Sequence, residues 1–389
     1  MAAASAGRAR TLEQLLAAKE IVVCCGSGGV GKTTTAAAAA AMSAVSLGAK
    51  TLVLTVDPAR RLADALGLGE LGNVERQIPA EAFKEAGVEP RGQLWAAMLD
   101  TKQSWDELVL RHAPDKATAD RILTNALYQN VSGRFVQSHE YIAMERLYEV
   151  HSAGRYDLIV VDTPPTRSAV DFLHAPDRMA DFFASRLLRW LTVSARSRWL
   201  AAASRPFYQV ADRLLGSQFL EDIAEFFLLF QSMYDGFSER AEAVKRLLHD
   251  RRTTFVVVAT LEPAPLREAE SFLRALRDQQ FHPGALVLNK VLPDYLRDPA
   301  VAAAAERLAA DAPKLAAALG GDVGSPPAVT RVLREVAESF RNFSVVAKRE
   351  AEQRAELGST PDVVVNVPYF DEDITDLAGL LKLGRAIWS

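Results

Sequence analysis

The chain has 389 residues, of which 24% are charged, and it carries a formal net charge of −4. This composition is ordinary for a globular protein and excludes a disordered chain or a small disulfide-rich scaffold. The acidic balance also argues against a general nucleic-acid binder, which is normally basic.

Two adjacent cysteines, Cys24 and Cys25, are the only thiols of the chain. Neighbouring residues of a strand point to opposite faces, so we expect no disulfide between them. A zinc site needs four ligands at suitable spacing, and none is expected. There is also no run of about 18 apolar residues that would span a membrane. We therefore expect a cytoplasmic protein that reaches a membrane, if at all, through a partner.

Short apolar runs rich in β-branched residues recur along the chain and are typical of buried strands. They are Ile21–Cys25, Thr51–Val56, Leu94–Leu99, Asp157–Val161, Thr254–Thr260, Ala285–Leu288 and Val363–Val367. Helical stretches separate these runs, which predicts the α/β class with a doubly wound, mostly parallel sheet of about seven or eight strands. Ligands of such a sheet bind at the carboxyl ends of its strands.

Two long stretches contain no strand candidate and look helical throughout. We predict that they form a helical subdomain, made of residues 101–150 and 174–250. The sheet domain is then discontinuous and consists of residues 1–100, 151–173 and 251–389. A connection of this length is too long for a plain crossover, which is why an inserted subdomain is expected.

The segment after the first strand matches the phosphate-loop pattern G-x-x-x-x-G-K-[ST] at every defined position. The predicted nucleotide-binding residues are Gly26, Ser27, Gly28, Gly29, Val30, Gly31, Lys32, Thr33 and Thr34. Glycines let successive N–H groups point at phosphate oxygens, and the helix that follows adds its positive end. Lys32 is expected at the β- and γ-phosphates and the Thr33 hydroxyl at Mg²⁺. The motif thus predicts a P-loop NTPase.

Two aspartates follow predicted strands and lie in longer motifs, Asp57 in Asp57–Asp64 and Asp162 in Asp162–Ser168. Each is a candidate for the metal or for placing the attacking water, which P-loop hydrolases need besides the loop. A loop aspartate that only caps the next helix is the alternative for each of them.

These motifs resemble those of the family of the arsenical pump ATPase (ArsA) and of the factor that targets tail-anchored membrane proteins, within the MinD/ParA-like P-loop ATPases. The resemblance continues at Phe255–Phe272, Leu286–Lys290 and Val367–Phe370. The run Glu140–Tyr148 is similar to actinobacterial members named anion-transporting ATPases. The resemblance implies a dimeric enzyme that uses ATP and Mg²⁺.

The resemblance also implies roles for individual residues. Asp57 corresponds to the aspartate that orients the attacking water, so the catalytic residues expected are Asp57 and Lys32. Asp162 corresponds to the aspartate that binds Mg²⁺ together with Thr33. The resemblance thus implies two acidic residues for hydrolysis, Asp57 for the water and Asp162 for the metal, each after a predicted strand.

Three further residues are implied on the base side of the nucleotide. Asn289 corresponds to the asparagine that reads the adenine edge, Glu262 to a glutamate that contacts nucleotide across the dimer, and Pro368 to the loop that packs on adenine. A turn residue is the alternative for Asn289. The segment Asn289–Leu292 lacks the aspartate of a guanine-reading motif, which disfavours GTP.

Ser27 stands where the family carries a signature lysine that acts on the nucleotide of the opposite subunit. Three explanations are open: slow hydrolysis, a lysine supplied by a related ArsA-like subunit in a heterodimer, or replacement by Arg60, Arg61 or Arg167. A homodimer and a heterodimer therefore both stay open. The cysteines by which relatives bind metalloid or zinc are absent, so neither arsenite activation nor a zinc clamp is expected.

The helical insert holds an arginine-rich stretch, Arg178–Arg213, and an apolar stretch, Phe219–Phe237. They are either ordinary amphipathic helices or a groove for a peptide or membrane-protein client. The function expected is a switch ATPase coupled to a protein or membrane partner. The alternatives are a low-turnover ATP sensor or regulatory subunit, and a ParA/MinD-like positioning ATPase.

Overall fold

The computed structural model describes residues 9–56, 61–69, 71–131, 138–163, 174, 226, 228, 234–319, 324–358 and 361–388. Asp57, Arg60 and Arg167, for which the sequence predicts roles, lie outside these residues. The arginine-rich stretch and most of the apolar stretch of the insert also lie outside them. Phe226 of that apolar stretch is described, and it is buried in the core beside the sheet.

An eight-stranded sheet forms the centre of the molecule, with the strand order β3-β4-β2-β5-β1-β6-β7-β8. The strands are β1 (Ile21–Cys25), β2 (Lys50–Thr55), β3 (Arg76–Gln77), β4 (Gln93–Met98), β5 (Leu158–Asp162), β6 (Thr253–Thr260), β7 (Pro283–Val291) and β8 (Val363–Pro368). Every pairing is parallel except that of β3 with β4. The predicted α/β class and strand number are confirmed, and each predicted strand is present within a few residues. Only β3 was missed, because two exposed residues carry no periodic signal.

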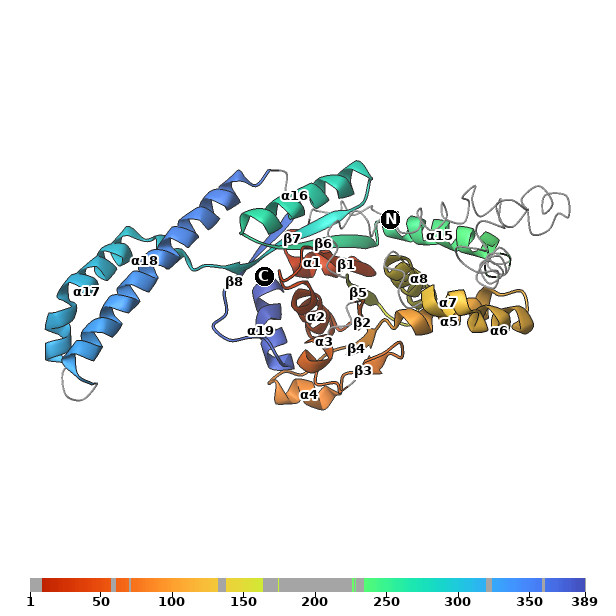
Figure 1. Ribbon diagram of the computed structural model, residues 1–389, viewed down its shortest axis with the longest axis horizontal. Coiled ribbons are helices and arrows are strands. Elements are labelled where there is room, and N and C mark those ends of the chain that lie inside the picture. Colours follow the sequence, from red (N-terminus) through yellow and green to blue (C-terminus); the bar gives the residue numbers. More distant parts are fainter. Residues whose placement is uncertain are drawn as a thin grey trace, which may run out of the picture.

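Helices cover both faces of the sheet (Figure 1). On one face lie α1 (Leu12–Leu16), α2 (Lys32–Met42), α3 (Arg61–Ala65), α4 (Ala80–Glu85) and α19 (Leu377–Trp388). On the other face lie α5 (Thr101–His112), α6 (Lys116–Thr124), α7 (Ala126–Val131), α8 (Ser138–Ser152), α15 (Tyr234–His249) and α16 (Pro263–Asp278). Two short helices of other types, the π-helix η1 (Ser43–Leu47) and the 3-10 helix η2 (Asp294–Arg297), follow α2 and β7.

The two cysteines show how the sheet separates the two cores. Cys25 packs in the core on one face and Cys24 in the core on the other, both at 1% exposure. This is the alternation expected of neighbouring strand residues. Burial raises the pKa of the Cys25 thiol to about 12 and that of Cys24 well above its ordinary value. Both thiols are therefore structural residues rather than nucleophiles.

Helix α2, which follows the phosphate loop, is packed closely between the sheet and α19. Its residues Ala36–Ala41 are all buried, and small side chains are needed for this approach. Gly384 of α19 completes the contact, since a Cβ there would lie 2.4 Å from Cγ of Met42. The carboxyl-terminal helix thus fixes the helix that presents the phosphate loop.

A hairpin of two long helices, α17 (Pro299–Ala318) and α18 (Pro326–Glu356), projects away from the sheet (Figure 1). The two helices pack along each other, and α18 returns to the sheet close to the end of β7. Within the described ranges, no helix combines the length and the apolarity needed to cross a membrane.

Candidate functional site

The phosphate loop connects β1 to α2 and adopts a conformation that requires glycine. Gly26, Gly29 and Gly31 have φ values of 152°, 78° and 95°, in the region that side-chain-bearing residues avoid. A Cβ at Gly26 would lie 2.2 Å from the carbonyl oxygen of Val258, and a Cβ at Gly31 would lie 2.3 Å from Nδ2 of Asn289. The loop is therefore fixed both by backbone conformation and by the neighbouring strands β6 and β7.

The start of α2 supplies the positive charge of this site. Gly31 is the residue before the helix and has no side chain to cap it, so the N–H groups of the first turn are left for a ligand. Lys32 is only 6% exposed, and its Nζ donates to the carbonyl oxygen of Ser27 at 2.7 Å. The ammonium group therefore lies across the loop that is expected to hold phosphate.

Ser27 makes a contact that the sequence did not reveal. Its hydroxyl donates to the carboxylate of Glu268 on α16. The resemblance implies a lysine at position 27. This chain instead has a neutral hydroxyl there, next to the carboxylate of Glu268. A cationic side chain at residue 27 would lie next to the carboxylate of Glu268.

Asp162 ends β5 and is completely buried, at 0% exposure. The parallel register pairs it with Cys24 of β1, two residues before Gly26, and with Thr55 of β2. Its Oδ2 accepts a hydrogen bond from the Thr55 hydroxyl at 2.9 Å. Thr163 follows, and its hydroxyl donates to the carbonyl oxygen of Cys24 at 2.8 Å. The carboxylate is consequently held at the base of the phosphate loop.

The donors at this place fit a magnesium ion. A carboxylate and a hydroxyl are the hard oxygen ligands that Mg²⁺ prefers, and Asp162 and Thr33 supply them at the end of β5 and in the first turn of α2. A carboxylate that is fully buried also needs a nearby cation to offset its desolvation. The residues present therefore suit the metal that a phosphate loop normally uses.

The predicted base-side residues lie at the same edge of the sheet. Asn289 lies within β7, two residues before its end, and not after the strand as predicted, because β7 extends to Val291. Glu262 follows β6 and Pro368 ends β8, and these three strands are adjacent. Nδ2 of Asn289 donates to the carbonyl oxygen of Val30 at 2.8 Å, while its Oδ1 accepts from the N–H of Lys290. Asn289 thus braces the phosphate loop in this structure. Glu262 and Pro368 are exposed beside it.

A cavity of about 330 Å³ lies at the root of the projecting hairpin. It is lined by Leu261, Val291, Leu292, Asp294, Arg297, Ala347, Glu350, Ala351, Arg354 and Ala355. Glu350 of α18 accepts a hydrogen bond from the N–H of Leu292 at 3.0 Å. Burial raises the pKa of Glu350, with a further contribution from Glu262. Helix α18 therefore reaches the base-side edge, which nothing in its sequence indicated.

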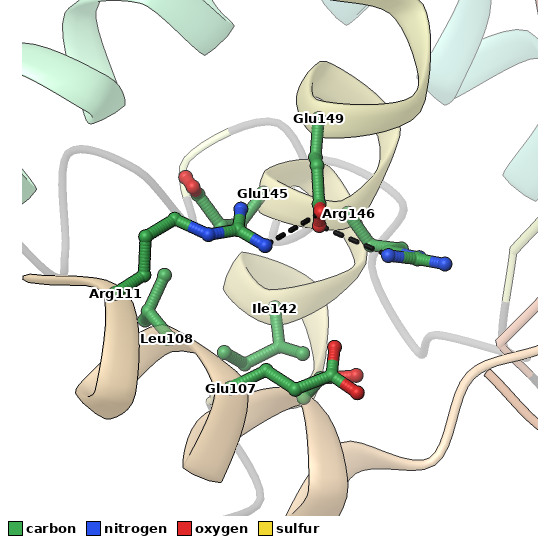
Figure 2. Close-up of a pocket in the computed structure, with 8 residues that line it drawn as sticks. Glu107, Leu108, Arg111, Ile142, Glu145, Arg146 and Glu149 are labelled. Carbon is green, nitrogen blue, oxygen red and sulfur yellow. Dashed lines mark hydrogen bonds and ion pairs between the residues drawn. The ribbon is translucent and has the colours of Figure 1, made fainter. Parts of the chain in front are cut away.

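A second, much smaller pocket lies between α5 and α8 (Figure 2). Its volume of about 10 Å³ has room for roughly one water molecule. Charged side chains dominate its walls, and Glu149 pairs with both Arg111 (2.6 Å) and Arg146 (3.0 Å). We interpret it as an ion-pair network that joins helices, because a substrate has no space there.

Sequence reasoning predicted the glycines, Lys32, Thr33 and Asp162 as site residues, but it missed the hydroxyl and carboxyl groups that contact Ser27, Asp162 and the carbonyl oxygen of Cys24. Thr55, Thr163 and Glu268 make those contacts. The two threonines had a usable signal, since Thr55 is the last residue but one of a predicted strand and Thr163 comes two residues after another. Glu268 had none, because it lies 241 residues from Ser27 in the chain.

The amino-acid sequence of this chain is similar to those of known proteins. The family model described as "Anion-transporting ATPase" (ArsA) matches residues 19–312. Two curated relatives carry the name "Putative arsenical pump-driving ATPase": that of Chlorobaculum tepidum is 26% identical over 254 residues and that of Prosthecochloris vibrioformis 25%. Each match covers 63% of this chain and 55% of the relative, so the chain spans about half the length of these curated relatives.

Proposed function

Because the chain belongs to the anion-transporting ATPase (ArsA) family, we propose that it binds Mg-ATP and hydrolyses it as a dimeric switch. The observation that carries the proposal is the phosphate loop itself, with the buried Lys32 and Asp162 on its two sides. A loop of this conformation, followed by an uncapped helix start, binds phosphate through backbone N–H groups. The asparagine at the end of β7 and the missing guanine motif favour adenine as the base.

The chemistry follows from positioning and electrostatics. Lys32 exchanges the carbonyl oxygen of Ser27 for phosphate oxygens, and its ammonium stabilises the charge of the transferring group. Asp162 and Thr33 would hold Mg²⁺, which neutralises the phosphates. Asp57 orients the attacking water, since it follows β2 next to β5. Glu262 and Pro368 complete the base side.

The switch is proposed to act on a protein or membrane partner through the helical subdomain of residues 101–150 and 174–250. In the sequence, Asp57–Arg60 come shortly after β2, and the residues after Thr163 come shortly after β5. Loss of the γ-phosphate would therefore change these two segments first. A membrane-protein or peptide client fits the apolar stretch of the insert, although Phe226 of that stretch is a core residue. Membership of the actinobacterial subgroup stays a prediction.

A second candidate function is favoured by Ser27. A subunit with a serine beside Glu268 has no cation at residue 27 to offer a neighbouring nucleotide. Such a chain would serve as a low-turnover, regulatory subunit in a heterodimer with a related ATPase. Turnover of the purified chain alone and with such a subunit distinguishes the two functions: activity that appears only in the mixture supports the second.

Calorimetry with Mg-ATP tests nucleotide binding directly. The wild-type chain is expected to bind ATP and ADP, and Lys32→Ala is expected to weaken ATP binding by at least about a hundredfold, because charge-assisted bonds to phosphate are lost. Lys84→Ala, on the exposed surface of α4, is the matched control and is expected to bind normally. No heat of binding from folded wild-type protein, or normal binding by Lys32→Ala, would overturn the proposal.

A further inference from the structure

The projecting hairpin carries a helix face that no other described part of the chain covers. Four apolar residues of α18 share this face and are about half exposed: Val332 (51%), Val336 (53%), Phe343 (53%) and Val346 (45%). Their spacings of four, seven and three residues place them on one line along a helix. Together with Ser339, which falls on the same line, they are called the α18 stripe below.

The α18 stripe is distinct from the seam of the hairpin itself. Helices α17 and α18 pack along each other, and the buried residues of α18 are Ala337, Ser344 and Ala347. Each buried residue follows a member of the stripe directly in the sequence, which rotates it by about 100° around the helix. The stripe therefore lies to one side of the contact with α17. It also lies beyond residue 312, where the family match ends.

Polar residues border the stripe on the side away from α17. Glu335, Asn342 and Arg349 follow each other at intervals of seven residues and therefore share one line. Glu335 also meets Arg331 within the helix, at 3.7 Å and with both side chains mostly exposed, which is a weak pair. An acid and a base thus stand at equal distances on either side of Asn342.

This pattern of charge is complementary to itself. If a second α18 helix runs antiparallel with a twofold axis near Asn342, Glu335 of each copy meets Arg349 of the other. A twofold interface makes every such contact twice. A parallel arrangement would instead place like charges side by side, which is unfavourable.

The stripe fits the same antiparallel axis in shape. Phe343 of one copy then faces the small Ser339 of the other, and Val336 faces Val346. Pairing a large side chain with a small one lets two helices interdigitate without voids. Four half-exposed apolar residues per copy leave water in the process, which drives association.

We propose that the α18 stripe binds a second copy of this chain, with the two α18 helices antiparallel. The 31 residues of α18 extend over about 46 Å, and the axis lies near the middle of the helix. In each copy the sheet lies at one end of the hairpin (Figure 1). The antiparallel pairing therefore puts the two sheet domains at opposite ends of the paired hairpins. This contact goes beyond the proposed switch, since it needs neither nucleotide nor the phosphate loop.

Sedimentation of the full chain without nucleotide, over a range of concentrations, tests the pairing. Wild type and Lys32→Ala are expected to form the same dimer, and Phe343→Asp is expected to be monomeric. Glu335→Arg and Arg349→Glu are each expected to raise the dissociation constant about tenfold, because two opposite-charge contacts become repulsive. The doubly reversed variant is expected to recover wild-type affinity. Arg341→Glu, on the opposite side of α18, is the matched control and is expected to behave as wild type.

Disulfide trapping provides an independent measurement of the antiparallel arrangement. Asn342→Cys lies at the proposed axis and is expected to cross-link to its own counterpart under mild oxidation. Arg341→Cys is expected to cross-link far less, and the native Cys24 and Cys25 are buried and do not interfere. A monomer at all concentrations, a dimer indifferent to Phe343→Asp, or a stripe that only binds anionic lipid vesicles would overturn the proposal.

Discussion

Side-chain contacts join the phosphate loop to three different elements, α2, α16 and β7. Lys32 donates a hydrogen bond to the carbonyl oxygen of Ser27, and the Ser27 hydroxyl donates to the carboxylate of Glu268. The side-chain amide of Asn289 donates to the carbonyl oxygen of Val30. Each contact joins the loop to α2, α16 or β7, so the loop is preorganised by its surroundings. Preorganised polar groups cost little rearrangement when charge develops, which is the main source of catalysis in phosphoryl transfer.

At the scale of the residue, we expect the identity of residue 27 to affect the rate of the proposed hydrolysis. Ser27→Lys is expected to raise kcat more than about tenfold if the missing cation limits turnover, since trans-acting cations supply about 10³–10⁵. Glu268 would pair with that lysine, so Ser27→Lys combined with Glu268→Gln is expected to be faster still. Steady-state phosphate release at saturating ATP measures both. An unchanged kcat in the combined variant would show that another group already supplies the charge.

Among the elements, α8 and α15 are joined by an ion pair with a buried carboxylate. Glu145 of α8 is 4% exposed, and its Oε1 accepts from Nε of Arg240 on α15 at 2.7 Å. The guanidinium also lies over the ring of Tyr148, 4.5 Å from its centroid. Glu145 also lines the charged pocket between α5 and α8 (Figure 2). The pair therefore ties α8 to α15, next to the pocket that α8 shares with α5.

Breaking this pair from one side is expected to be costly. Arg240→Met leaves the carboxylate of Glu145 buried without its cation and is expected to lower the free energy of unfolding by about 3 kcal/mol. Replacing both partners, with Glu145→Leu and Arg240→Met, is expected to recover most of that loss, because no buried charge remains. Urea denaturation at constant pH measures all three proteins. Equal losses in the single and double variants would contradict this account.

Across the whole molecule, α18 joins the projecting hairpin to the edge of the sheet where nucleotide is proposed to bind. Its Glu350 accepts from the N–H of Leu292, one residue after β7. Burial raises the pKa of this carboxyl above its ordinary value. The fold therefore favours the protonated form, and its contribution to stability is present at low pH and is lost as pH rises through the raised pKa.

The corresponding test uses a side chain that stays neutral. Glu350→Gln keeps an oxygen for the N–H of Leu292 and removes the charge, so it is expected to raise the free energy of unfolding near neutral pH. Below the ordinary carboxyl pKa, wild type and variant are expected to converge. Thermal unfolding across this pH range measures the difference, with Glu352→Gln on the exposed side of α18 as control. A lower stability of Glu350→Gln at neutral pH would refute the sign.

The sequence by itself determined the class of fold and the identity of the phosphate loop. Buried parallel strands are nearly continuous apolar runs, and the loop pattern is local, so both are visible over a few residues. Asp162 and Asn289 were predicted as site residues for the same reason, since each directly follows such a run. The short strand β3 was not, because its pairing with β4 depends on position and not on pattern.

Only the tertiary structure decided which groups hold the site and where the hairpin points. Ser27 and Glu268 are 241 residues apart, Asn289 and Val30 are 259 apart, and Thr55 and Asp162 are 107 apart. Such contacts follow from strand order, and the sequence does not state that order. Likewise, only packing against α17 showed that one line of small residues on α18 is buried and that a line of apolar residues beside it is exposed. Secondary structure depends on neighbours in the chain, whereas a site and a surface depend on which elements the fold brings together.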